Sequence, residues 1–275
     1  MTIDSSSDSV ATRVGFIGLG QQGRPMAINL CRDGFDVSVY DIRPDAVAEL
    51  TAIGAIAARS PAEVGRNAEI VAVIVLDDAQ VEAVVAGADG LLGTMAPGGA
   101  IVIHSTIRLR TLRRLAALAE SKRVDLIDAA VGSNAAGATN RSMTLLVGGD
   151  ARVIDRCRPM LASSAAQIAH MGPLGAGLAA KLAHQVILAL NILGASEGMS
   201  LGAALGVVPE TLEKAIRTCR AQSLIADHWT DFKPGSHGAI VFQKDLTIAL
   251  EAAEELGLSM PGAVLIRELI PRLMS

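Results

Sequence analysis

The chain has 275 residues, a length that suits two domains, because typical domains contain roughly 100 to 200 residues. Hydrophobic residues make up 51% of the chain and charged residues 19%, which is enough apolar surface for a compact fold and argues against extensive disorder. With a net charge of -4, the chain has no excess positive charge to attract a phosphate backbone, and an aromatic content of 2% leaves few side chains on which bases could stack. We therefore expect no nucleic-acid partner.

The first twelve residues, MTIDSSSDSVAT, are polar and acidic, and we expect them to form a disordered tail. They lack the basic start and the apolar run of a secretory signal. The cysteines are widely spaced and include no CxxC pair, so we expect reduced thiols and a cytoplasmic location. The long apolar stretch from Leu182 is interrupted by polar side chains, and we expect a buried helix there rather than a membrane span.

Between Arg13 and about residue 172, short apolar runs alternate with amphipathic segments. The runs typical of strands are RVGFIGLG, FDVSVYD, EIVAVIVL, GAIVIHST and VDLIDAAV. They are continuous rather than alternating, as strands covered on both faces of a parallel sheet are, and the segments between them have helical periodicity. The pattern predicts a doubly wound α/β domain of the Rossmann type over residues 13–172.

After MGPLGAG the strand-like runs cease, and residues 173–275 predict an all-helical second domain for substrate binding and dimerisation. Its first helix, over about residues 174–205, is far longer than the average helix of roughly 11 to 12 residues. A helix of this length predicts either a spine between the domains or a contact between subunits.

The first strand is followed by a glycine pattern that is typical of dinucleotide binding. Gly18, Gly20 and Gly23 have G-x-G-x-x-G spacing between a strand and a helix, the context that the motif requires. The first glycine permits a tight turn, the second lets the pyrophosphate approach the backbone, and the third allows helix and strand to pack closely. The helix start offers N–H groups to phosphates, and we include Gln21 and Gln22 of this loop among the cofactor contacts.

Asp41 ends the second strand, at the position where a carboxylate accepts hydrogen bonds from the adenosine ribose hydroxyls. This favours NAD, because the 2′-phosphate of NADP would meet a negative charge. Arg43 keeps NADP open as the alternative cofactor, since a guanidinium can bind a phosphate. Asp41 could instead be a turn residue that opens the DIRPD loop.

Lys181 is the sole formal charge between residues 172 and 196. His184 and Gln185 follow at spacings of three and four, which places the three side chains on one helix face. The alternative for any helical lysine is a surface residue with an extended side chain. Partial burial near a helix start would lower the pKa of Lys181, and we hypothesise that it transfers a proton during hydride transfer. Gln185 would orient the reacting oxygen, and His184 would either polarise it or pack in the crevice.

The segments GFIGLGQQGRPMAINL, HSTI, DAAVGSNAAGA, GPLGAG, KLAHQ and FQKDL occur in one order, and with them the chain resembles the β-hydroxyacid dehydrogenase family. That family includes 3-hydroxyisobutyrate dehydrogenase and tartronate semialdehyde reductase, and the resemblance runs from about Val14 to the C-terminus. It implies a helical C-terminal domain like that of 6-phosphogluconate dehydrogenase and a homodimer or homotetramer. It also implies NAD(P)-dependent oxidation of a small 3-hydroxy acid to its semialdehyde.

The resemblance also implies roles for single residues. The catalytic lysine of the family matches Lys181, and the lysine of its KDL motif, which approaches nicotinamide and substrate, matches Lys244. Further cofactor contacts match Leu76 and Thr106. Lys244 has a structural alternative as a charge at a helix N-terminus that pairs with an acidic neighbour such as Asp245.

The loop that receives the substrate carboxylate in the family departs from the family pattern. Gly132, Ser133 and Asn134 stand where the family has serine and two glycines, and we expect these three residues to contact the substrate. Family members that act on sulfonated aldehydes also have glycine at the position of Gly132. This difference from the family pattern suggests a substrate of different length or polarity.

Three readings therefore compete. The first is a dehydrogenase of 3-hydroxy acids, and the second is a reductase of sulfonated aldehydes or imines on the same fold. Lys181 argues against an imine reductase, since those enzymes commonly carry aspartate or tyrosine at that position. The third is a non-catalytic NAD(H)-binding sensor. The histidines show no metal-ligand spacing such as HExxH, so no metal is expected.

Overall fold

The structure is a computed structural model, and it describes residues 12–132, 135–232 and 236–274. The predicted tail therefore lies outside the described residues, apart from Thr12. The chain divides into two compact units, Met1–Lys181 and Leu182–Ser275. The boundary that the sequence places between residues 172 and 173 stays a prediction.

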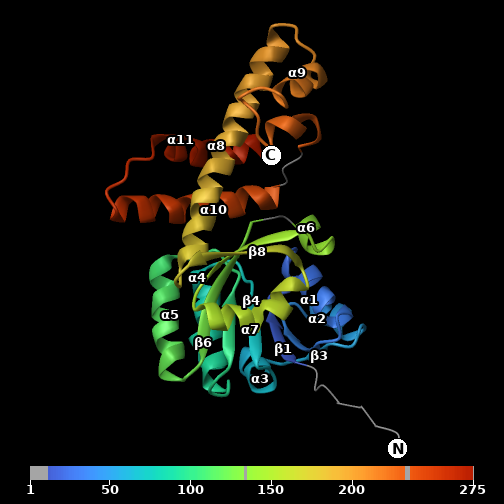
Figure 1. The fold of residues 1–275 in the computed structure, drawn as a ribbon, viewed down its shortest axis with the longest axis vertical. Helices are drawn as coiled ribbons and strands as arrows, with labels where there is room; N and C mark the ends of the chain where they lie inside the picture. Colours follow the sequence, from blue (N-terminus) through green and yellow to red (C-terminus); the bar gives the residue numbers. More distant parts are fainter. Residues whose placement is uncertain (1–11, 133–134, 233–235, 275) are drawn as a thin grey trace, which may run out of the picture. The chain divides into compact units, whose positions relative to one another are not determined.

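Within the described residues, the strands of the first unit form one eight-stranded sheet in the order β3-β2-β1-β4-β5-β6-β7-β8 (Figure 1). Every pairing is parallel except that of β6 with β7, which is antiparallel. The strands are β1 (Arg13–Ile17), β2 (Asp36–Tyr40), β3 (Ile56–Ala57), β4 (Ile70–Val73), β5 (Ala100–Ile103), β6 (Asp125–Val131), β7 (Met143–Gly148) and β8 (Ala165–Gly172). The mainly parallel α/β fold predicted from the sequence is confirmed.

Three of these strands are absent from the sequence prediction. β3 has two residues, and both are exposed. β8 reads AAQIAHMG and is mostly exposed or half-buried, because it is an edge strand with only one neighbour. β7 reads MTLLVG, which contains only two β-branched residues, and it pairs antiparallel with β6. Strands that are short, exposed or poor in β-branched residues lack the continuous β-branched pattern of the central strands, so the sequence pattern does not reveal them.

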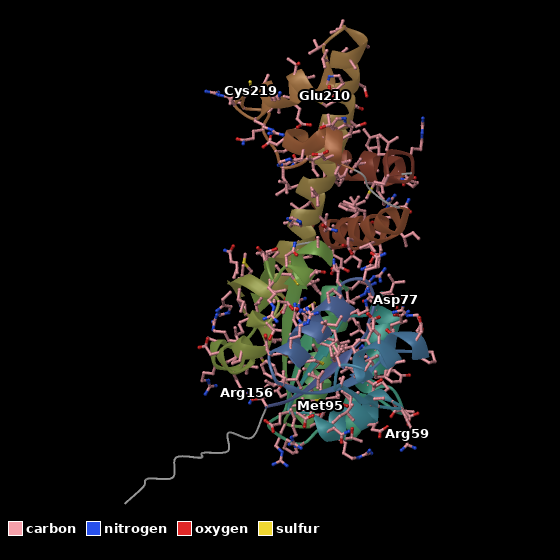
Figure 2. The ribbon with its side chains drawn as sticks, turned by 90° about the vertical axis from the view of Figure 1, so that its right-hand side faces the viewer. Arg59, Asp77, Met95, Arg156, Glu210 and Cys219 are labelled. Atoms are coloured by element: carbon pink, nitrogen blue, oxygen red, sulfur yellow. The ribbon has the colours of Figure 1, made fainter. Side chains whose placement is uncertain are left out.

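Helices cover both faces of the sheet, with α1 and α2 on one side and α5 on the other (Figure 1). The first core packs α1, α2 and α7 on one face, and the second packs α3, α4 and α5 on the other. Figure 2 marks Met95, a buried side chain of the second core, and the exposed Arg59. The helices are α1 (Gly23–Arg32), α2 (Pro44–Thr51), α3 (Pro61–Asn67), α4 (Asp78–Ala86), α5 (Leu109–Ser121), α6 (Ala135–Thr139) and α7 (Ala151–Ala162), with the 3₁₀ turn η1 (Leu91–Gly93).

The second unit is all-helical in the described residues, as predicted. α8 (Ala176–Ala204) begins in the first unit and ends in the second, and its bounds agree within two residues with the predicted long helix. The remaining elements are α9 (Pro209–Ile216), the 3₁₀ turn η2 (Ala226–Asp231), α10 (Ser236–Glu255) and α11 (Pro261–Leu273). Apolar side chains of α8, α10 and α11 form the main core of this unit.

By length and composition α8 is able to cross a membrane, a test that the core helix of a soluble protein also passes. The sequence predicts a buried helix, and 33% of its most apolar window is buried. Most of this window is therefore not buried, and α8 carries exposed apolar side chains that are available for contact with another subunit.

Candidate active site

The carboxyl ends of the central strands lie at one level. The register pairs Ile17 with Val73, Val73 with Ile103, and Ile103 with Asp128, so β1, β4 and β5 end together beside the middle of β6. Dinucleotides bind outside this edge in open α/β sheets, where the loops after the strands meet. The glycine loop, Asp41, Leu76 and Thr106 all follow strands of this edge.

The loop between β1 and α1 has the geometry that a dinucleotide needs. Gly18 has φ +95°, a left-handed conformation that favours glycine. A β-carbon on Gly23 would overlap the carbonyl oxygen of Gly18, so the third glycine is required for close packing of α1 on β1. A β-carbon on Gly20 would meet no atom within 4 Å, which leaves the backbone open to a ligand. The N–H groups at the start of α1, next to Gln21 and Gln22, suit the pyrophosphate.

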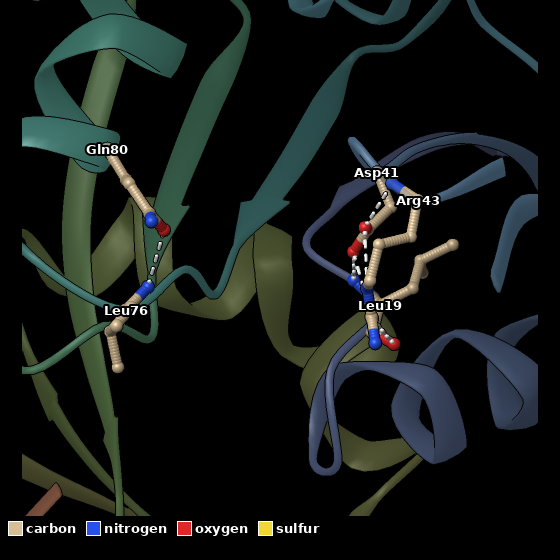
Figure 3. Close-up of polar contacts among 5 residues, drawn as sticks. All are labelled: Leu19, Asp41, Arg43, Leu76 and Gln80. Carbon is tan, nitrogen blue, oxygen red and sulfur yellow. Dashed lines mark hydrogen bonds and ion pairs between the residues drawn. The ribbon is translucent and has the colours of Figure 1, made fainter. Parts of the chain in front are cut away.

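Asp41 and Arg43 form one polar cluster with the backbone of Leu19 (Figure 3). The Leu19 N–H donates to Asp41 Oδ2 at 2.6 Å, and Arg43 Nε donates to Asp41 Oδ1 at 3.1 Å. Arg43 also donates to the Leu19 carbonyl oxygen at 2.9 Å. Burial opposes ionisation of Asp41, but the hydrogen bonds from Arg43 and Leu19 outweigh it, so the pKa of Asp41 lies below its ordinary value. The carboxylate is therefore ionised at neutral pH.

The loops after β4 and β5 are held together by a serine that the sequence prediction did not include. Ser105 is buried, and its Oγ accepts the Val75 N–H at 2.8 Å. The N–H of the next residue, Leu76, donates to Gln80 Oε1 at 3.0 Å (Figure 3). The Leu76 side chain is half-exposed, and Thr106 is partly buried. Both predicted cofactor contacts therefore lie in loops of fixed geometry at the carboxyl edge.

The KLAHQ segment lies in the first half of α8. Lys181 and His184 are half-buried, and Gln185 is buried. Helical spacing places all three on one face of α8, as the sequence indicates. Gln185 Nε2 donates to Asp245 Oδ2 at 2.7 Å, so this amide is held by a residue of α10.

Lys244 lies in the middle of α10 rather than at a helix N-terminus, and its Nζ is 2.8 Å from Asp245 Oδ1. The Asp245 side chain is 1% exposed, against 21% for Lys244. A buried carboxylate thus joins the Gln185 amide to the Lys244 ammonium. Removing one partner of such a buried group is costly, so this cluster holds its three side chains in fixed positions.

Of the predicted substrate loop, Ser133 and Asn134 lie outside the described residues. The Gly132 N–H donates to the Thr144 carbonyl oxygen at 2.9 Å, which fixes the start of the loop against β7. A β-carbon at Gly132 would lie 3.2 Å from that oxygen. In the part of the chain that the structure describes, no three His, Cys, Asp or Glu side chains form a group suited to a metal ion.

Asp128 is the most notable polar residue that the sequence prediction missed. It is 2% exposed, and its carboxylate accepts N–H groups from Gly175 and Leu178 at the start of α8, at 2.7 and 2.6 Å. Burial raises the pKa of Asp128, and the backbone hydrogen bonds partly offset this effect. The available signal was an acidic residue inside the buried run VDLIDAAV.

His104, directly after β5, is buried, and its Nδ1 lies 2.6 Å from the Ala129 carbonyl oxygen. Because a carbonyl only accepts, Nδ1 carries the proton, and Nε2 has no hydrogen-bond partner among the described residues. Desolvation by burial lowers the pKa of His104 to about 4. The imidazole is therefore neutral at physiological pH.

We expect acid to destabilise the protein through His104. The folded-state pKa lies below the unfolded value of 6.5, so the stabilisation is complete above pH 6.5 and is lost as pH falls towards about 4. The loss is about 3 kcal/mol over that window. Urea unfolding of His104→Asn at pH 7.5 and pH 5 should show a smaller pH effect than the parent shows. His170→Asn, at an exposed histidine of β8, is the control. Equal pH dependence in the parent and His104→Asn would contradict the assignment.

A sheet with a dinucleotide loop, followed by an all-helical unit, defines the class of two-domain NAD(P)-dependent dehydrogenases. Residues 13–172 match the family model for the NAD-binding domain of 6-phosphogluconate dehydrogenase. Residues 175–275 match the model described as the NAD-binding domain of NADP-dependent 3-hydroxyisobutyrate dehydrogenase. The chain therefore belongs to the β-hydroxyacid dehydrogenase family and is an NAD(P)-dependent 3-hydroxyacid dehydrogenase.

Individual relatives agree with this assignment. An NAD-dependent L-serine dehydrogenase of Pseudomonas aeruginosa is 33% identical and aligns over 90% of this chain and 88% of its own length. A 2-hydroxy-3-oxopropionate reductase of Escherichia coli is 34% identical over 94% of this chain and 89% of its own. The solved structure of Mycobacterium tuberculosis 3-hydroxyisobutyrate dehydrogenase with L-serine superimposes with a TM-score of 0.86, at 29% identity, over 95% and 93% of the two chains.

Proposed function

We propose that the protein interconverts a small 3-hydroxy acid and its semialdehyde with NAD as the preferred cofactor, and that Lys181 is the general acid and base. The observation that supports this most directly is the attachment of α8 to the sheet. Asp128 binds the first turn of α8 at the level where β1, β4 and β5 end, which is the edge that carries the dinucleotide loop. Lys181 follows Leu178 by three residues on that helix.

The proposed chemistry divides the substrate's hydrogens between two acceptors. A nicotinamide cofactor held by the glycine loop and Asp41 would supply the hydride acceptor for the carbinol carbon in oxidation and the hydride donor in reduction. Lys181 Nζ removes the hydroxyl proton as the neutral amine, and donates it to the carbonyl oxygen in the reverse direction. An alcohol thus becomes an aldehyde, with one hydride on the cofactor and one proton on the lysine.

The remaining polar residues would bind and orient the substrate. Gln185, held by Asp245, would direct its amide at the reacting oxygen, and His184 would polarise that oxygen. Lys244 would offset the negative charge of the substrate or the cofactor. We assign Gly132, Ser133 and Asn134 to the acid group of the substrate, as the family resemblance implies.

The preference for NAD is inferred from Asp41. Its ionised carboxylate would accept the ribose hydroxyls and would repel a 2′-phosphate. Arg43 already donates to Asp41 and to the Leu19 carbonyl, so its guanidinium has to leave these contacts to bind a phosphate. Relatives in this family use NAD or NADP, and this cluster favours the former.

A substrate panel tests the activity. NAD reduction, followed at 340 nm with 3-hydroxyisobutyrate, glycerate, serine, threonate and sulfonated analogues, should reveal one preferred 3-hydroxy acid. Preference for a sulfonated compound would instead support the reading suggested by Gly132. NADH binding in a fluorescence titration, without turnover of any compound, would favour the sensor.

We also propose that the second unit forms a homodimer, or a homotetramer built from that dimer. Ile187, Leu190 and Leu201 of α8, and Leu205 directly after its end, recur with helical spacing, and they are 61%, 39%, 61% and 75% exposed. The stripe that they form is interrupted by glycines 194 and 198, at which a β-carbon would meet nothing within 4 Å. Exposed apolar stripes on this scale are typical of protein interfaces.

Introducing charge into this stripe should dissociate the protein. We expect Leu201→Arg to shift the sedimentation coefficient towards the monomer value, because a buried arginine without a partner is strongly unfavourable in an interface. Ile53→Arg, at an equally apolar position that is 48% exposed in the first unit, should leave the sedimentation unchanged. A monomeric parent protein, or an unaffected Leu201→Arg oligomer, would refute the proposed interface.

A cytoplasmic location is also proposed. Cys31, Cys157 and Cys219 are all free, and burial raises the pKa of Cys157 to about 11, which keeps it a thiol. Free thiols without disulfides are typical of reducing compartments.

A further inference from the structure

We propose that Asp128 is a positioning residue of the reaction, because its carboxylate fastens the first turn of α8 to the sheet and so determines where Lys181 lies. This inference rests on the proposed role of Lys181. Asp128 itself touches neither substrate nor cofactor in this assignment. It acts through the helix backbone.

The carboxylate satisfies the N–H groups that a helix start leaves without partners. Oδ1 accepts the Gly175 N–H at 2.7 Å and Oδ2 accepts the Leu178 N–H at 2.6 Å. The Gly177 N–H also contributes a hydrogen bond. A negative charge at this end of a helix is favourable, because the aligned peptide dipoles leave a partial positive charge there.

Two glycines make this close attachment possible. A β-carbon on Gly148, at the end of β7, would lie 2.6 Å from Asp128 Oδ1. A β-carbon on Gly177, in the first turn of α8, would lie 2.9 Å from Oδ2 and would overlap the Leu146 carbonyl oxygen. The helix start is therefore enclosed by β6 and β7 and has little room to shift.

The attachment determines the position of the lysine because the helix is rigid over this distance. Lys181 lies three residues after Leu178, which is about 4.5 Å along the helix axis. Any displacement of the first turn moves the Lys181 backbone by a similar amount. A misplacement of about 1 Å can cost about 10²-fold in rate when a proton must be transferred in a defined geometry.

Asp128→Asn tests the inference with almost no change in volume. The Asn oxygen can accept one N–H, but its NH2 group would face the other, so the first turn should loosen. We expect a hydride-transfer rate in a single turnover, per NADH-binding site, that is about 10²-fold lower, with unchanged NADH affinity. Amide hydrogen exchange at residues 175–181 should become faster. If Asp128 contributed only to global stability, Asp128→Asn would lower the number of NADH-binding sites and leave the hydride-transfer rate per site unchanged.

The control is Asp150→Asn, at another aspartate that caps a helix. Asp150 accepts the Arg152 N–H at 2.8 Å at the start of α7, and this variant should keep the parent's rate per site. Gly177→Ala is the second test, because it displaces the same turn while the carboxylate remains. It should reproduce the loss of rate even if Asp128→Asn does not fold.

A double-mutant cycle with Lys181→Ala identifies the route of the effect. If Asp128 acts through Lys181, Asp128→Asn should not lower the residual rate of Lys181→Ala any further. A parent-like rate in both Asp128→Asn and Gly177→Ala, or the same fold loss in the Lys181→Ala background, would overturn the inference. Full turnover by Lys181→Ala alone would instead refute the proposed function, so the two failures are distinguishable.

Discussion

Lys181→Ala should lower kcat by about 10²- to 10⁴-fold, the range for loss of a general acid or base. The reason is that Lys181 is the only Lys, Arg, Asp or Glu of α8 before Glu197, so no other charged side chain of this segment would carry the proton. NADH affinity should survive, because the glycine loop and Asp41 follow β1 and β2, whereas Lys181 lies on α8. The measurements are kcat in both directions and a fluorescence titration with NADH.

Lys214→Ala is the matched control for this experiment. Lys214 is an exposed lysine on α9, so its removal changes the net charge equally without touching α8. Its turnover should equal that of the parent. If Lys181→Ala keeps the parent's kcat, another group transfers the proton and the assignment is wrong.

Asp41→Asn should change the cofactor preference towards NADP by about 10²-fold, measured as the ratio of kcat/KM for the two cofactors. Removing the carboxylate eliminates roughly 2 to 4 kcal/mol of repulsion with the 2′-phosphate at an effective dielectric constant of about 20. The substitution also removes the ion pair in which Arg43 Nε lies 3.1 Å from Asp41 Oδ1, so the guanidinium becomes available to that phosphate. NAD should bind less tightly, since an amide accepts the ribose hydroxyls less strongly than a carboxylate.

Asp36→Asn serves as the control for the cofactor experiment. Asp36 lies at the amino end of the same strand, β2, and carries the same charge. Its cofactor ratio should be that of the parent, because the dinucleotide binds at the carboxyl end. An unchanged ratio in Asp41→Asn, or a parent enzyme that already prefers NADP, would contradict the role given to Asp41.

The central strands, the glycine loop and α8 were predictable from the sequence because each depends on neighbours within a few residues. Val71 and Val102 belong to continuous β-branched runs, and such runs indicate strands that are buried on both faces. β8 was missed because an edge strand buries little, and β7 because its sequence, MTLLVG, contains only two β-branched residues. The positions of Lys181 and Gln185 on one helix face likewise follow from helical spacing alone.

The partners of the polar groups were not predictable in the same way. Gln185 donates to Asp245, sixty residues along the chain, and Asp128 accepts from Gly175, forty-seven residues away. Arg43 could have faced a phosphate in solvent, but it donates to the Leu19 carbonyl. Lys181 was proposed from its isolation in an apolar segment, whereas Asp128 was overlooked because its partners are backbone N–H groups that no residue pattern reveals.

The sequence by itself determined five strands of the sheet and their order along the chain, the dinucleotide loop and the helix face that carries the lysine. These properties arise from backbone preferences and from side-chain periodicity, which involve residues that are only a few positions apart in the sequence. Only the tertiary structure decided that a buried aspartate of β6 binds the start of α8 and that Asp245 joins Gln185 to Lys244. Such contacts depend on which distant segments pack together, and a buried polar group must find its partner among them.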